Sequence, residues 1–125
     1  MTTPTTTDNK TLDMINRIDV FVWDPRNFQD QNMMLFARGL SNDIGQAFRN
    51  LDKARNHIAD RAANMGRTLD RGSNTASDAD FIQRLSADLV MWQTSFDDNV
   101  DALMRFLSLA AQDDAAKDAV AALFD

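Results

Sequence analysis

Apolar residues recur every three or four positions along most of this chain, the spacing of amphipathic α-helices. The first and shortest such segment contains Leu12, Ile15, Ile18 and Val22. Two longer segments cover residues 25–71 and 78–124, and none of the three shows the strict alternation that would indicate a strand. The pattern predicts an all-α protein with helices at about 11–23, 25–71 and 78–124.

Local signals define the ends of these helices. Pro25 disfavours the helical conformation at Asp24, which suits Asp24 as the N-cap of the second helix. Gly72 stands where a left-handed C-cap residue is expected, and Ser77 with Asp80 resembles a capping box. We expect a flexible polar tail over residues 1–10, followed by a single helical domain over residues 11–125.

Two places in the long segments permit a break. Around residues 39–42 the stretch ARGLSNDIG contains two glycines, and a polar residue there could cap a new helix. Residues 112–114 contain no residue that enforces a stop. The last segment therefore either continues to Leu123 or turns here into a short final helix.

The connection between the long segments is short. Gly72 to Ser77 is a length that joins antiparallel neighbouring helices, so we predict a long antiparallel helical hairpin. Pairing outward from its tip places opposite each other residues whose numbers sum to about 150. Leu40 is then expected near Leu109.

The open end of this hairpin is more apolar than two helices can bury between themselves. The runs NMMLFARGL, ALMRFLSLAA and AVAALF place apolar side chains on more than one helix face. The N-terminal helix can cover them, completing a three- or four-helix bundle, another copy of the chain can cover them, or both can do so. The candidate interaction residues are Trp23, Phe28, Met33, Met34, Phe36, Leu40, Trp92, Phe106 and Phe124.

Core packing is the competing interpretation for several of these residues. Trp92 lies directly in the apolar seam of the third segment, and Trp23 with Phe28 has the spacing of a hydrophobic staple. Met33 and Met34 fit either an adaptable binding surface or a core.

Composition narrows the functional classes. The 125 residues suffice for one domain, and the chain has no cysteine, no tyrosine and no glutamate. Motifs that need a thiolate or a glutamate are therefore excluded, and the single histidine, His57, has no nucleophile nearby. We predict no enzyme activity, no cofactor and no metal site. The longest apolar run, 119–124, is too short to cross a membrane.

Charge is distributed unevenly along the chain. Residues 25–72 carry eight basic and five acidic side chains, whereas residues 77–125 carry three basic and ten acidic ones. Opposite signs favour pairing of the two arms, and they equally favour stacking between copies, which in a head-to-tail arrangement gives a ring or a filament. The net charge of -6 argues against nucleic-acid binding.

Two functional hypotheses follow. The first is a non-enzymatic subunit that self-assembles into a homo-oligomer such as a secreted filament, needle or virion component. The second is a small acidic helical binding protein or inhibitor, an adaptor or nucleic-acid mimic, that acts on one protein partner. We expect a soluble protein, either cytoplasmic or secreted without a cleavable signal.

The overall layout resembles known assembly proteins. A threonine-rich leader, MTTPTTT, precedes a cysteine-free hairpin with an apolar open end, as in needle and filament subunits of bacterial type III secretion systems. The layout is similar, more loosely, to small hairpin proteins of type VII secretion and to helical virion coat proteins. The Trp-x-Gly turn of the type VII group is missing, since the bend reads RGSNTAS. The resemblance concerns architecture and assigns no functional residue.

Overall fold

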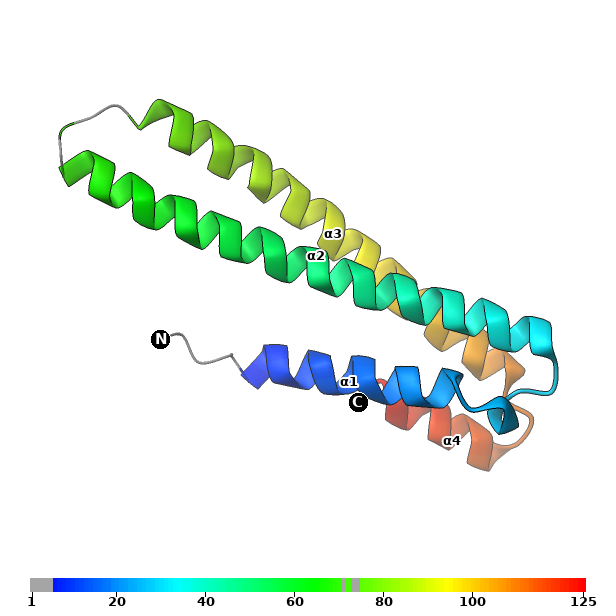
Figure 1. Ribbon diagram of the computed structural model, residues 1–125. Helices are drawn as coiled ribbons and strands as arrows, with labels where there is room; N and C mark the ends of the chain where they lie inside the picture. Colours follow the sequence, from blue (N-terminus) through cyan, green and yellow to red (C-terminus); the bar gives the residue numbers. More distant parts are fainter. Residues whose placement is uncertain (1–5, 71, 73–74) are drawn as a thin grey trace. The chain divides into compact units, whose positions relative to one another are not determined.

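The computed structural model describes residues 6–70, 72 and 75–125, and these residues are mostly helical, with no strand among them (Figure 1). The elements in order are α1 (Thr6–Val22), the 3-10 turn η1 (Pro25–Asn27), α2 (Gln31–Asp70), α3 (Ala76–Ala110) and α4 (Asp114–Leu123). Helices α2 and α3 pack against each other as a hairpin. The predicted all-α hairpin with a short N-terminal helix is confirmed.

Helix α1 begins earlier than the apolar pattern indicates. It starts at Thr6, so residues 6–10 of the predicted tail are helical, while residues 1–5 lie outside the described part of the chain. The apolar face that docks the helix contains Ile18 and Val22, both fully buried. Once that face nucleates a helix, each further polar residue adds a backbone hydrogen bond at little cost, so the helix extends beyond its apolar signal.

The helix predicted to start at Pro25 is only one turn long. The Asp24 carboxylate accepts a hydrogen bond from the Arg26 backbone N–H at 3.0 Å, which confirms Asp24 as an N-cap. The element it caps, η1, ends at Asn27, because Phe28 is extended at φ -131° and ψ 140°. The prediction of one continuous helix from residue 25 is therefore wrong at its start.

A second aspartate starts the long helix. The Asp30 carboxylate accepts from the Asn32 backbone N–H at 2.7 Å, and α2 begins at Gln31. The helix then passes through residues 39–42 without a break. Ala37 and Ile44 are buried on either side of this stretch. Their packing holds the helix together despite the low helix propensity of the glycines.

The hairpin tip contains the expected glycine. Gly72 has a φ of 74°, and its N–H donates to the Leu69 carbonyl at 2.9 Å. The Ala79 N–H donates to the Thr75 carbonyl at 3.0 Å, so α3 begins just before the predicted Ser77 cap. The remaining tip residues, 71, 73 and 74, lie outside the described residues.

The permitted break near 112–114 is present. Helix α3 ends at Ala110, and Asp113 is extended at φ -138° and ψ 174°. The Asp113 carboxylate accepts from the Ala116 backbone N–H at 2.7 Å, which caps the start of α4. A capping aspartate thus converts the end of the third segment into a separate short helix.

One compact unit contains the open end of the hairpin. It comprises the chain up to residue 45 and residues 97–125, and thus α1, η1, α4 and the adjoining parts of α2 and α3. Its buried apolar residues come from all four helices: Ile18, Val22, Ala37, Ile44, Leu103, Leu107, Val120 and Leu123. The N-terminal helix and α4 therefore both help to build the apolar core at this end.

Arginines from other helices hold the C-terminal ends of α1 and α4. Neither helix has a basic residue in its last turn. Arg38 of α2 donates to the carbonyls of Val22 at 3.0 Å and Trp23 at 3.3 Å. Arg17 of α1 donates to the main-chain oxygens of Leu123 and Asp125 at 3.4 and 2.7 Å. Each guanidinium satisfies carbonyls that have no partner within their own helix and complements the helix dipole.

The second compact unit, residues 46–96, is the part of the hairpin nearest the tip. Phe48 and Phe96 lie with their ring centroids 6.3 Å apart. Near the tip, the Arg61 guanidinium forms an ion pair with Asp78 at 3.0 Å and covers the Phe81 ring at 4.1 Å. Asp78 is buried, so this pair ties the beginning of α3 to α2.

The pairing register differs from the prediction. Phe36 lies against Phe106, with ring centroids 4.7 Å apart, and Leu109 is 88% exposed. The observed pairs are displaced by about two helical turns along one arm from those expected. The register prediction was wrong because it used only the tip, whereas the register depends on how side chains interlock along the whole seam.

Gly72 and Gly66 provide a matched test of this fold. We expect Gly72→Ala to lower the free energy of unfolding by about 1 kcal/mol, because alanine is strained at the positive φ. Gly66→Ala should raise it by about 0.5–1 kcal/mol, because this helical glycine has open space where the Cβ would stand. Urea unfolding followed by circular dichroism measures both changes. Equal effects of the two substitutions on the free energy of unfolding would contradict the positive φ described for Gly72.

Candidate interaction surface

An aromatic edge is exposed on the unit that contains α1 and α4. Phe36 is 56% exposed although its ring packs on Phe106, and Leu40, one turn further along α2, is half-buried. We call Phe36, Leu40 and Phe106 the aromatic edge. Its residues come from the facing helices α2 and α3, and Phe36 stays largely open to solvent although α1 and α4 belong to the same unit. The structure thus brings together three of the residues predicted for interaction.

Trp23 forms a separate exposed site. Its indole is 57% exposed and lies under the Arg38 guanidinium, whose central carbon is 4.2 Å from the ring centroid. The staple predicted between Trp23 and Phe28 is absent, because Phe28 instead meets Phe21 edge to face with centroids 6.1 Å apart. Leu35, three residues before Arg38 on α2, is 52% exposed and extends the apolar surface beside the stacked pair.

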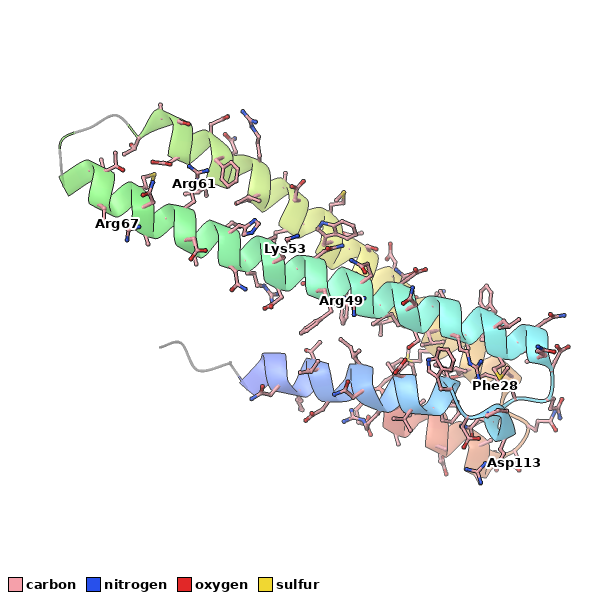
Figure 2. All side chains as sticks on the ribbon, in the orientation of Figure 1. Phe28, Arg49, Lys53, Arg61, Arg67 and Asp113 are labelled. Carbon is pink, nitrogen blue, oxygen red and sulfur yellow. The ribbon has the colours of Figure 1, made fainter. Side chains whose placement is uncertain are left out.

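The other predicted residues are more enclosed. Met34, Trp92 and Phe124 are half-buried, and Trp92 belongs to the unit nearest the hairpin tip. Phe124 is the C-cap of α4, where its N–H donates to the Ala121 carbonyl at 3.2 Å. Phe28 and Met33 line a cavity described below, and Figure 2 labels Phe28 on the segment that leads into α2.

Several residues that contribute to the exposed apolar surface or hold the helix ends were not among the predicted interaction residues. Leu35, Leu109 and Val20 are exposed apolar side chains that lie outside the main seam of their helices. Their departure from the three-four spacing was a usable signal. Arg17 and Arg38 carried no such signal, because the carbonyls that they bind lie on other helices.

The unequal charge of the arms is visible on the surface. In the unit nearest the tip, Arg49, Lys53 and Arg67 are exposed along α2, and Figure 2 labels them along that helix. Arg61 differs from them because its charge is matched by Asp78. On the other arm, aspartates are exposed along α3 and α4, including Asp88, Asp98, Asp114 and Asp118.

The Asp24 carboxylate has a perturbed affinity for protons. Arg26 donates to it from Nε at 3.0 Å and from Nη2 at 2.9 Å, in addition to the backbone bond. These hydrogen bonds, with the side-chain ones the largest cause, hold the pKa of Asp24 below its ordinary value of 3.8, and the same pairing raises the pKa of Arg26. Asp24 is thus fixed as an anion beside the end of α1.

The described residues contain neither a metal-binding group nor a membrane span. No three histidine or aspartate side chains cluster as metal ligands there, and none of the described helices is both long and apolar enough to cross a bilayer. Comparison with protein-family models, curated proteins and solved structures finds no match to this chain. The function has to be inferred from the residues and their geometry.

Arg38 should contribute more to stability than an ordinary surface arginine. We expect Arg38→Ala to lower the free energy of unfolding by about 1–2 kcal/mol, because two carbonyls at the end of α1 lose a charged donor and Trp23 loses its stacking partner. Arg49→Ala is the control, since Arg49 donates to the Gln46 side chain within α2, and a change within about 0.5 kcal/mol is expected. Equal losses in urea unfolding would contradict the role assigned to Arg38.

The Asp24 pKa can be measured directly. Because its folded pKa is lowered, the stabilisation from the ionised carboxylate is present above the ordinary value of 3.8 and is lost as the pH falls through the folded pKa. In Arg26→Ala, we expect the pKa measured by carboxyl-carbon NMR to rise part of the way back, since the backbone N–H remains. An unchanged pKa in that variant would show that the arginine side chain is not the main cause.

Proposed function

We propose that this protein is a non-enzymatic helical subunit that associates with further copies of itself through the aromatic edge. The observation that carries the proposal is the exposure of Phe36. More than half of this ring faces solvent, although it is paired with Phe106 and lies beside Leu40. Aromatic side chains are enriched at the centres of protein interfaces, where they supply much of the binding energy.

The exposure of Phe36 points to a partner because other apolar side chains of the same unit are buried. Ile44, Leu103 and Leu107 are buried in the unit that contains α1 and α4, yet Phe36 in the same unit stays 56% exposed. Exposed side chains such as Leu35 and the stacked Trp23 add further apolar surface to the same unit. Exposed apolar side chains gathered on one unit in this number are typical of an interaction site.

Charge supports a second copy as the partner. The exposed cations of α2 include Arg49, Lys53 and Arg67, and the exposed carboxylates of α3 and α4 are of opposite sign. The cations on α2 of one copy can therefore meet the carboxylates on α3 and α4 of another, which favours association between identical chains. If that contact is head to tail it repeats, and the product is a ring or a filament such as the needles and coats considered above.

Phe36 variants test the proposal. We expect the purified protein to self-associate at micromolar concentrations in sedimentation equilibrium, and Phe36→Ser to weaken that association about tenfold or more by removing the exposed ring. Val90→Ser is the matched control, because Val90 is 67% exposed on α3, belongs to the other compact unit and should leave the association constant unchanged.

Two results would contradict the proposal. One is a wild-type protein that stays monomeric at high micromolar concentration, which would favour the alternative of a small binding protein acting on a different partner. The other is equal weakening by Phe36→Ser and Val90→Ser. Since Phe36 also contacts Phe106, circular dichroism must show that the variant is folded under the conditions of the association experiment.

A further inference from the structure

A cavity of about 300 Å³ lies among the ends of the elements in the unit that holds α1 and α4. Its walls come from the end of α1, η1, the start of α2, the end of α3 and one side of α4. The side chains of Phe21, Phe28, Met33, Leu107 and Val120 form much of its apolar wall. Of these, Leu107 and Val120 are buried.

Small side chains create the space. Ala110, Ala111, Ala116 and Ala119 line the cavity on the side of α3 and α4. The edge-to-face contact between Phe21 and Phe28 holds the opposite side. Alanines facing aromatic rings leave a volume that the chain does not fill, and a cavity with an apolar lining is a poor site for water but a good one for a hydrocarbon group.

The mouth of the cavity is polar. Arg26, Asn27, Gln29 and Gln112 stand there and are exposed. The Arg26 charge is matched by Asp24. Asn27 Nδ2 donates to the Phe21 carbonyl at 2.8 Å, which leaves its side-chain oxygen as an acceptor at the mouth. Three uncharged amides, beside the paired Arg26, thus line the cavity, and they can bond a single polar group of a ligand.

We propose that this cavity binds a small, mainly aromatic or branched aliphatic molecule that carries one uncharged hydrogen-bonding group. Its size is at the lower end of that of ligand pockets, and it combines apolar walls with a few polar groups as such pockets do. A partly open hollow lined by five segments suits a compact molecule better than it suits a flat protein surface. The bound molecule would join α1 and η1 to α3 and α4, and so stabilise this unit.

The probe for this proposal is 1-naphthol, which has two fused rings and one hydroxyl. We expect it to bind the full chain with a dissociation constant of about 1 mM or tighter. In methyl NMR spectra, the largest shifts should come from Ala116, Ala119, Val120 and Leu107. The midpoint of thermal unfolding should rise with the concentration of 1-naphthol.

Variants that fill the cavity give the decisive comparison. Ala116→Leu and Ala119→Leu should each weaken 1-naphthol binding about tenfold or more, because the added side chain occupies the space of the probe. Ala122→Leu on α4 is the control, since Ala122 is exposed outside the cavity lining, and its binding should equal that of the wild type.

Two variants are used because a leucine can overpack one position while the other still folds. Binding is compared only among variants whose methyl spectra show the folded state. The proposal is overturned if 1-naphthol produces no saturable shifts in the wild type, if those shifts fall on methyls outside the cavity, or if a folded filled variant binds as tightly as Ala122→Leu.

Discussion

The burial of Ile18, Val22, Ile44 and Leu103 is the interaction on which the rest of this structure depends. These are the largest side chains that are fully buried, and they come from α1, α2 and α3. Each contributes about 1.5–3 kcal/mol when it leaves water. Without this core, α1 would be a short isolated helix, which is marginal in water. With it, the ends of α1 and α4 come within reach of Arg38 and Arg17.

The same packing creates the two candidate sites. Because α1 and α4 help to enclose the core at the open end of the hairpin, the aromatic edge around Phe36 is left outside it, and a cavity remains among the ends of the helices. The first site is the exposed surface proposed for self-association, and the second is the partly open pocket proposed for a small molecule. The aromatic edge uses side chains outside the core, whereas the cavity is lined in part by the core residues Leu107 and Val120.

Most elements of the fold could be predicted from local signals, and the sites could be predicted only in part. Phe36, Leu40 and Phe106 were identifiable because apolar residues wrapped around more than one face of each helix. The region of Leu109 was expected opposite Leu40 through the wrong register, and Leu109 is in fact 88% exposed. Phe28 was expected to pair with Trp23, yet an unpredicted break before α2 lets it contact Phe21 instead.

The amino-acid sequence by itself determined the helices, the turn at Gly72 and the breaks beside Asp24 and Asp113. The spacing of apolar residues, a glycine at a helix end and a capping aspartate each depend on residues only a few positions apart. These features can therefore be recognised in the sequence. The tertiary structure alone decided the register of the hairpin, the arginines that hold distant carbonyls, and which apolar side chains stay exposed. Those outcomes depend on how surfaces far apart in the chain fit together, and local spacing does not specify that fit.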